Sequence, residues 1–390
     1  MSWRYLKIAD FCSTGSGGTP SKSKPEYYEG GDIPWIKSGD LKDSTIYEAN
    51  EYITAAGLEN SSAKIVEKDS ILIAMYGATV GRLAILGINA ATNQAICNIR
   101  PDTTIADMKY LYYFLRSKFS YFVENAVGGA QPNISQGLIK SLEVPLPSLI
   151  EQKRIADILD KAADIRQKRE QAVKLADDFL RATFLEMFGD PVANPKRWDV
   201  ASLLEYGSFK NGMNFTKGES GSVLKCLGVG NFKSLATITC MDNIDEIELN
   251  TLPSDDYLLK DGDIVFVRSN GNKALVGRCL TIYPNKEKVT FSGFCIRYRI
   301  EKSAITAEYL NFLFRTPSMK RQMLSGGQGA NIQNISQGTL SALRIPVPPL
   351  EKQQTFSKIV SFHSELMKKL NINIVETNDM FDSISQTYFK

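Results

Sequence analysis

The residues of this chain best suited to chemistry are polar and basic side chains in glycine-rich loops. Arginine pairs bidentately with guanine, asparagine or glutamine pairs with adenine, and serine, threonine and lysine contact phosphates. Glycine lets a backbone approach a duplex closely. The pattern therefore predicts contacts with a polynucleotide. In the first half the candidates are Lys37, Ser38, Tyr76, Thr79, Arg82, Asn93, Gln94, Gln131 and Asn133. In the second half they are Asn231, Lys233, Arg268, Ser269, Asn270, Asn272, Lys273, Arg278, Gln328, Asn331 and Gln333.

Residues for catalysis are scarce by comparison. The chain has one histidine, His363, which disfavours histidine-dependent nucleophilic catalysis and histidine-rich metal sites. Its six cysteines include no CxxC pair, and no GxxxxGK[ST] loop occurs. The glycine-rich residues 14–20 lack the strand and helix of a dinucleotide-binding loop, and we interpret them as a surface turn. We expect no catalytic residue, no cofactor and no metal in this chain.

Two acidic residues leave one enzymatic alternative to weigh. Asp102 and Asp107 superficially resemble carboxylates of a metal-dependent nuclease, which must converge on a cation from neighbouring strands. Here they lead directly into an apolar stretch with helical spacing at residues 108–117. We interpret them as the acidic first turn of a helix.

The chain repeats itself once. The segment NISQG at residues 133–137 recurs at residues 334–338, and Val80-Gly81-Arg82 recurs as Val276-Gly277-Arg278. One repeat of this size indicates tandem domains rather than a solenoid. A single polar loop is often an ordinary turn, but loops at equivalent places in both halves favour the binding hypothesis.

Composition limits the kind of protein this can be. The chain has 390 residues, of which 43% are hydrophobic and 23% charged, as in ordinary globular proteins. Its formal net charge is only +3, so a polynucleotide site must be a local basic surface. The longest apolar stretch, residues 71–91, is broken by Arg82 and three glycines, and predicts two buried strands rather than a membrane span. The unpaired cysteines favour a reducing, cytoplasmic location, and the first ten residues do not form a secretion signal.

Each half begins with short β-branched runs separated by turn residues and ends in a long helical pattern. Residues 151–188 and 351–388 contain no glycine or proline and carry apolar residues at helical spacing. Ser148 and Glu151 predict a capping box, and Gly189 with Pro191 predicts the end of the first helix. A helix this long cannot bury an apolar face alone, and the obvious partner is its own repeat.

At this point the sequence resembles a known family over essentially its whole length. The matching segments, in order, are residues 33–41 (IPWIKSGDL), 78–82 (ATVGR), 93–94 (NQ), 133–135 (NIS), 144–147 (VPLP), 151–155 (EQKRI) and 187–191 (MFGDP). Together they resemble the specificity subunit of type I restriction-modification enzymes. The second half departs from the pattern, because residues 224–232 (LKCLGVGNF) replace the first segment and Ser292-Gly293 stands where Asn93-Gln94 does.

The resemblance implies an α/β (α+β) fold with a tandem repeat of two similar, mainly β target-recognition domains. Two long antiparallel coiled-coil helices would separate them with pseudo-twofold symmetry. The expected boundaries are residues 1–148 for the first target-recognition domain and 149–190 for the first spacer helix. Residues 191–348 would form the second target-recognition domain and 349–390 the second spacer helix.

The resemblance also implies a DNA-binding function without bond chemistry. Each domain would read one half of a bipartite duplex site, and the differing loops of the two halves predict an asymmetric target. The partners would be two methyltransferase subunits and restriction subunits. S-adenosylmethionine, ATP and Mg would belong to those partners, and no membrane is involved. The alternatives are a catalytic DNA-processing subunit, such as a nuclease or methyltransferase fragment, and a scaffold that binds only protein.

Overall fold

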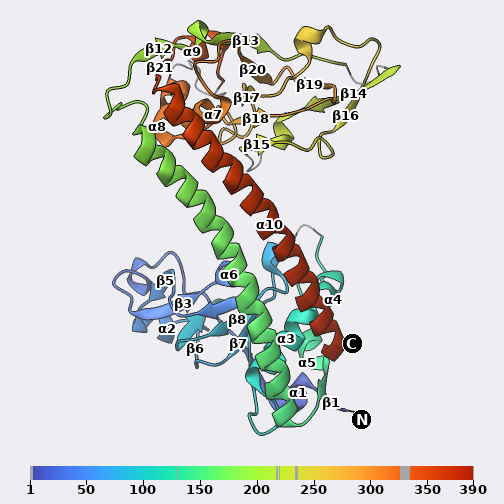
Figure 1. Cartoon of the computed structure of the whole chain (residues 1–390). Helices are drawn as coiled ribbons and strands as arrows, with labels where there is room; N and C mark the ends of the chain where they lie inside the picture. Colours follow the sequence, from blue (N-terminus) through green and yellow to red (C-terminus); the bar gives the residue numbers. More distant parts are fainter. Residues whose placement is uncertain are drawn as a thin grey trace. The chain divides into compact units, whose positions relative to one another are not determined.

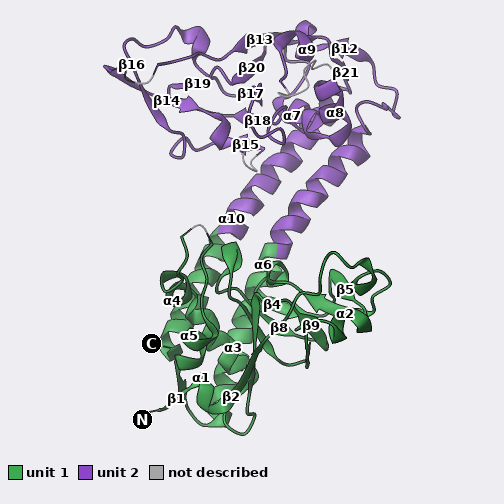
Figure 2. Cartoon of the chain, turned by 180° about the vertical axis from the view of Figure 1, so that it is seen from behind, with its two compact units in different colours: residues 1–170, 372–390 green, residues 171–371 purple. Residues whose placement is uncertain are grey.

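The fold was obtained as a computed structural model, which describes residues 3–129, 131–216, 218, 220–232, 236–325 and 334–389 (Figure 1). It divides into two compact units, Met1–Glu170 with Ile372–Lys390 (unit 1) and Gln171–Asn371 (unit 2). Figure 2 colours them separately and shows that unit 1 includes the C-terminal end of the last helix. Each long helix therefore contributes one part to each unit. The expected division into recognition domains and spacer helices concerns function and stays a prediction.

Unit 1 contains two sheets and a strand pair. The five-stranded sheet has the order β2 (Cys12–Ser16), β10 (Ile96–Pro101), β7 (Ile71–Ala74), β8 (Leu83–Leu86), β4 (Ser44–Ile46). The four-stranded sheet has the order β5 (Glu51–Ile53), β3 (Ile33–Ile36), β9 (Ala90–Thr92), β6 (Ile65–Val66). The pair joins β1 (Arg4–Lys7) to β11 (Glu143–Leu146). The helices are α1 (Ile8–Phe11), α2 (Ala55–Glu59), α3 (Met108–Ser117), α4 (Phe119–Glu124), α5 (Gln136–Ser141) and the first part of α6 (Leu149–Phe188).

Unit 2 repeats this arrangement. Its five-stranded sheet has the order β13 (Gly207–Asn211), β20 (Cys295–Ile300), β17 (Asp263–Val267), β18 (Cys279–Ile282), β15 (Thr237–Ile238). Its second sheet has the order β16 (Glu246–Leu249), β14 (Ser222–Leu227), β19 (Val289–Phe291), and β12 (Val200–Ser202) pairs with β21 (Arg344–Pro346). The helices are α7 (Ala307–Arg315), α8 (Pro317–Ser325), α9 (Gln337–Ser341) and the first part of α10 (Leu350–Phe389).

The repeat extends to strand direction and to single hydrogen bonds. The pairs β3·β9 and β4·β8 are parallel, and so are their counterparts β14·β19 and β15·β18. The buried hydroxyl of Tyr110 donates to the carbonyl of Pro145 at 2.5 Å, and that of Tyr309 donates to Pro346 at 2.7 Å. The predicted tandem α+β architecture is therefore confirmed.

The ends of α6 follow the predicted signals only in part. The Oγ of Ser148 accepts from the backbone N–H of Glu151 at 3.3 Å, as a helix cap should. The return half of the predicted capping box is absent among the described contacts, because the carboxylate of Glu151 instead accepts from Arg154 at 2.7 and 2.8 Å. At the other end Gly189 has a φ of +79° and donates to the carbonyl of Leu185 at 2.8 Å, so it ends the helix as predicted.

A buried glutamine attaches each long helix to its unit. The side chain of Gln152 accepts from the N–H of Asp107 at 2.8 Å and donates to the carbonyls of Ile105 and Pro147 at 3.1 and 2.9 Å. Gln353 makes the same three contacts in unit 2, with Thr306, Ala304 and Pro348 at 2.9, 3.3 and 2.7 Å. Because both amide atoms are satisfied, these buried polar side chains position the helix start instead of destabilising the core.

The two long helices run antiparallel, as residues within each unit show. In unit 1, Arg154 contacts the hydroxyl of Tyr388 at 3.3 Å, whereas Arg169, farther along α6, donates to the carbonyl of Asn373, which lies earlier in α10. In unit 2, Asp177 lies 3.3 Å from Nε2 of His363. Moving forward along α6 therefore means moving back along α10. His363 is a seam residue, as predicted.

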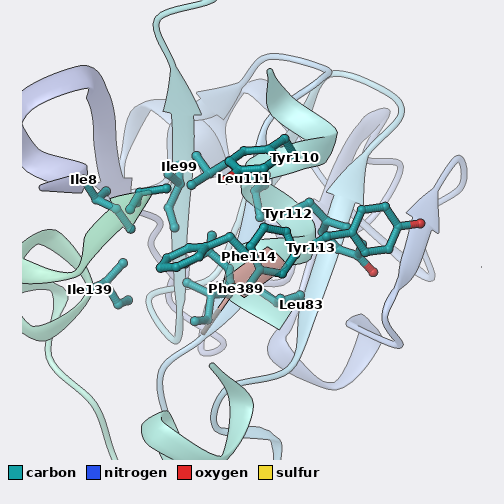
Figure 3. Close-up of a cluster of buried hydrophobic side chains, with 14 of the residues drawn as sticks. Ile8, Leu83, Ile99, Tyr110, Leu111, Tyr112, Tyr113, Phe114, Ile139 and Phe389 are labelled. Atoms are coloured by element: carbon teal, nitrogen blue, oxygen red, sulfur yellow. The ribbon is translucent and has the colours of Figure 1, made fainter. Parts of the chain in front are cut away.

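Aromatic residues from the far end of each helix complete the core of each unit. In unit 1, the ring of Phe389 lies 5.3 Å from that of Tyr110 and 5.9 Å from that of Phe114, and Figure 3 shows it among the buried side chains of α3. In unit 2, Phe184 and Phe188 of α6 pack on Tyr309 at 5.8 and 4.9 Å. The core of unit 1 therefore needs a segment distant in sequence, whereas the end of α6 leads directly into unit 2.

The glycine-rich residues 14–20 are not the surface turn we expected. They continue from strand β2 into a close approach to β9, where Gly18 donates to the carbonyl of Thr92 at 2.9 Å. A Cβ at Gly17 would lie 1.9 Å from that same carbonyl oxygen. Glycine is required here because two backbones touch.

The shared core leads to a prediction about unit 1. Replacing Phe389, which is 3% exposed, by alanine should cost about 3–5 kcal/mol through lost burial and a cavity. Hydrogen exchange should speed up in β7 and α3 of unit 1 and stay unchanged in β17 and α7 of unit 2. Phe362→Ala on the same helix is the control, because Phe362 is 70% exposed. Equal loss of protection in both units would contradict the division of α10 between them.

Candidate nucleic-acid interface

Parallel strands bring two of the predicted loops of unit 1 together. Because β3 and β9 are parallel, their carboxyl ends lie at the same edge of the sheet. The N–H of Asn93, after β9, donates to the carbonyl of Ile36, at the end of β3, at 2.9 Å. Lys37 and Ser38 therefore lie beside Asn93 and Gln94, as the binding hypothesis requires.

Two further loops join the same edge. Met75 donates to the carbonyl of Ala95 at 2.7 Å, and Ile134 donates to the carbonyl of Met75 at 2.9 Å. Tyr76 and Asn133 form a β-bridge, and Gly77 donates to the carbonyl of Pro132 at 2.8 Å. We call the resulting set the unit 1 loop edge, and its members are Lys37, Ser38, Tyr76, Thr79, Asn93, Gln94, Gln131 and Asn133.

The side chains of this edge differ in their exposure and in the partners they already have. Tyr76 is 45% exposed, and Gln94 is exposed and accepts from the hydroxyl of Thr19. Lys37 is paired with Glu51, so a phosphate would have to displace a carboxylate. The carboxamide oxygen of Asn93 is buried without a hydrogen-bond partner among the described residues. Asn93 thus supports the edge through its backbone and presents less of its side chain than the sequence predicts.

Arg82 lies next to the loop edge, with its side chain in a different place from the other candidates. Its N–H donates to the carbonyl of Thr79 at 2.9 Å, so it closes the turn that carries Tyr76. Its exposed side chain lines a separate hollow with Asp43, Arg116 and Phe119. The Arg82 side chain therefore lines a hollow beside the loop edge, whereas the other candidates of unit 1 belong to the edge itself.

Unit 2 has the same backbone frame with different side chains. Ser292 donates to the carbonyl of Leu227 at 3.0 Å, which is the contact that Asn93 makes with Ile36. Arg268 donates to Phe294 at 2.8 Å and accepts from Ile335 at 2.9 Å, so it occupies the place of Met75. Ser269 forms a β-bridge with Asn334, as Tyr76 does with Asn133. The sequence equivalence of Ser292-Gly293 with Asn93-Gln94 is therefore correct.

Several candidates in unit 2 shape their own loops. The Oδ1 of Asn231 accepts from Gly228 at 2.9 Å, and the Oδ1 atoms of Asn270 and Asn272 accept from backbone N–H groups at 2.7 and 3.0 Å. Arg278 donates to the carbonyls of Ala274 and Phe232, both at 3.2 Å. Lys273 is exposed. The candidates Lys233, Gln328, Asn331 and Gln333 lie outside the described residues.

Metal ligands and activated thiols are the catalytic features that the described residues allow us to judge. No cluster of three or more His, Cys, Asp or Glu residues there could hold a metal ion. Burial raises the pKa of the Cys97 thiol to about 11 and those of Cys226 and Cys279 to about 12, so these thiols stay protonated and weakly nucleophilic near neutral pH. Within the same residues, no helix combines the length and apolar character needed to span a membrane.

Comparison with known proteins agrees with this geometry. The family model described as the type I restriction modification DNA specificity domain matches residues 2–175 and 213–376. The chain belongs to this family, whose members are the non-catalytic, DNA-recognising subunits of type I restriction-modification systems.

Individual relatives cover nearly the whole chain. The specificity subunit of the type I restriction enzyme MjaIX from Methanocaldococcus jannaschii is 26% identical over 396 residues, covering 94% of this chain and 89% of the relative. That of the type I restriction enzyme StySPI from Salmonella potsdam is 23% identical and covers 100% of this chain and 88% of the relative. The crystal structure of the S subunit from M. genitalium has the same fold, with a TM-score of 0.57 at 17% identity and coverage of 100% and 96%.

The thiol environments predict a selective labelling pattern. Iodoacetamide reacts with thiolates, and a raised pKa keeps Cys97, Cys226 and Cys279 protonated at pH 8. The native chain should therefore be alkylated at Cys240, which is exposed, whereas Cys97, Cys226 and Cys279 should react only after unfolding. Mass spectrometry of tryptic peptides measures the sites. Rapid native labelling of Cys97 or Cys279 would contradict the packing described for the two cores.

Proposed function

We propose that this chain reads an asymmetric, bipartite duplex DNA target, with one half-site bound by the loop edge of each unit. The observation that carries the proposal is the common backbone frame of the two units. The hydrogen bonds of Asn93 and Ser292, and those of Met75 and Arg268, place equivalent loops at equivalent edges. A frame of this kind presents side chains to a groove while leaving their identity free to vary.

The side chains on that frame support asymmetry. Tyr76 in unit 1 corresponds to Ser269 in unit 2, and Gln94 corresponds to Gly293. Each base pair presents its own pattern of donors, acceptors and methyl groups in the major groove. Different side chains at the same groove position therefore select different bases, and the two half-sites differ in sequence.

The proposed partners are two methyltransferase subunits and, through them, restriction subunits in the cytoplasm. This chain would hold no cofactor, and S-adenosylmethionine, ATP and Mg would act in the partners. Exposed apolar side chains along the two long helices support docking there. A helix that served only as a spacer in water would need only polar residues on its exposed side. Examples are Leu175 and Phe179 on α6 and Phe362 and Val375 on α10.

The loop edges can be tested one at a time. Tyr76→Ala should relax base preference in one half-site, and Arg268→Gln should do so in the other, each by about 1–3 kcal/mol of discrimination if the side chain reads a base. The measurement is the methylation motif produced by each variant with its methyltransferase partner. Tyr47→Ala is the control, because Tyr47 is 70% exposed but follows β4 at the opposite end of the sheet. A change in both half-sites from either variant would contradict separate reading.

Spacing can be tested independently of reading. If the helices set the unread gap, insertion of four helical residues after Ala172 and four after Asn371, close to the boundaries between units, lengthens both by roughly 6 Å. B-DNA rises about 3.4 Å per base pair, so the gap should grow by one or two base pairs with both half-sites unchanged.

A second insertion controls for disturbance of the seam. Seven residues in each helix keep the coiled-coil phase, whereas four act as a stutter, so the longer variant should add about three base pairs without local unwinding. Half-sites that change while the gap stays constant would assign recognition to the helices and contradict the proposal.

A further inference from the structure

A hollow of about 580 Å³ in unit 2 collects positive charge, of which the sequence predicts only Arg278 for DNA binding. Four cations from four different segments line it: Arg181 of α6, Arg278 before β18, Arg315 at the end of α7 and Lys320 of α8. The one carboxylate among its lining residues is that of Asp177, which faces His363 at 3.3 Å. Buried phenylalanine rings, Phe312 and Phe314 among them, form its apolar walls.

Backbone carbonyls hold three of these cations in place. Arg278 and Lys320 both donate to the carbonyl of Ala274, at 3.2 and 3.1 Å, and Arg315 donates to the carbonyl of Cys279 at 3.2 Å. These contacts fix the direction of the cations around the hollow. A ring of positioned cations favours the binding of an anion.

The cations disfavour one another in the absence of such an anion. Burial lowers the pKa of Arg315, and the neighbouring charges of Arg181 and Arg278 lower it further. Burial and Arg278 also lower the pKa of Lys320. An anion in the hollow would raise the pKa values of Arg315 and Lys320, because it stabilises their charged forms.

Unit 1 contains a counterpart in the same place. Arg82 and Arg116 correspond to Arg278 and Arg315 in the repeat, and they line a smaller hollow of about 280 Å³. There Asp43 supplies a carboxylate, and the guanidinium of Arg116 lies 4.7 Å over the ring of Phe381. The position recurs, but the excess of positive charge belongs to unit 2.

We propose that the unit 2 hollow binds a phosphate group, and that this is a backbone phosphate of the duplex next to the half-site read by unit 2. The inference rests on the proposed function. The loop edge and the hollow are adjacent, because Val267 donates to the carbonyl of Arg278 at 2.8 Å and directly precedes Arg268. Through Arg181, helix α6 takes part in DNA binding as well as in spacing.

The test uses the full chain and its salt-dependent binding to duplex DNA that contains the methylation motif. The variant Arg181→Gln/Lys320→Gln removes two cations without touching Arg278 or Arg315, which hold loops. Loss of this one phosphate contact should reduce the slope of log affinity against log salt by about 1, with the preference for cognate over unrelated DNA unchanged. Lys174→Gln on α6 is the matched control, because Lys174 is exposed outside the hollow.

A second probe distinguishes DNA from a small phosphate ligand. Pyrophosphate should raise the Tm of the wild-type chain less than duplex DNA does, and the effect of the duplex should shrink in the double variant. An unchanged salt slope in a variant that still discriminates its target overturns the phosphate site while the proposed function stands. A Tm shift by pyrophosphate that requires Arg181 and Lys320, with no change in DNA binding, overturns the assignment to DNA. Failure of the wild-type chain with its partners to select any duplex overturns both.

Discussion

The structure depends on how each 40-residue helix buries its apolar face. A single helix cannot bury its own apolar face, and in proteins most helix stability comes from packing that face against a partner. Here α6 inserts Phe184 and Phe188 into the core of unit 2, while α10 inserts Phe381 and Phe389 into the core of unit 1. Unit 1 is therefore closed by a segment that lies far away in the sequence, whereas α6 leads directly into unit 2. A change at the extreme C-terminus acts on the N-terminal unit for this reason.

In the loop edges, the backbone contacts that hold the loops are separate from the side chains that the loops expose. The frame consists of backbone hydrogen bonds between strand ends, and Gln152 and Gln353 attach it to the helices through satisfied amide groups. None of these contacts constrains the side chains of Tyr76 or Ser269. Under the proposed function, such a surface can change its base preference without loss of stability, because the side chains proposed to read bases do not hold the fold.

Much of the fold was predictable from local patterns, since the signals involved act over a few residues. The helix predicted at 108–117 is α3, and the positive φ of Gly189 ends α6 as a C-terminal glycine should. The capping box at Ser148 was half wrong, because Arg154 competes for Glu151 at three residues' distance. The sequence pattern could not reveal the contact of Gly17 with Thr92, because that contact depends on strand pairing across the sheet.

For the candidate site, too, some features were predictable from local patterns and others depended on contacts between distant residues. Recurrence of loops in both halves predicted which segments meet, and the β-bridges of Tyr76 with Asn133 and Ser269 with Asn334 agree with it. What each side chain does there depends on partners that composition does not specify. Lys37 is matched by Glu51 from the neighbouring strand, and Arg278 by two carbonyls. A polar residue in a repeated loop thus predicts well which loops lie together, but it predicts poorly what its side chain binds.

Charge pairing at the edges has a consequence for selectivity under the proposed function. A chain with a net charge of +3 attracts DNA weakly over long distances. Lys37 must exchange the carboxylate of Glu51 for a phosphate on binding, which offsets part of the gain. The affinity for unrelated DNA is therefore low, whereas the correct bases of the target add contacts that wrong bases cannot make. Selectivity then arises as much from weak general attraction as from strong specific contacts.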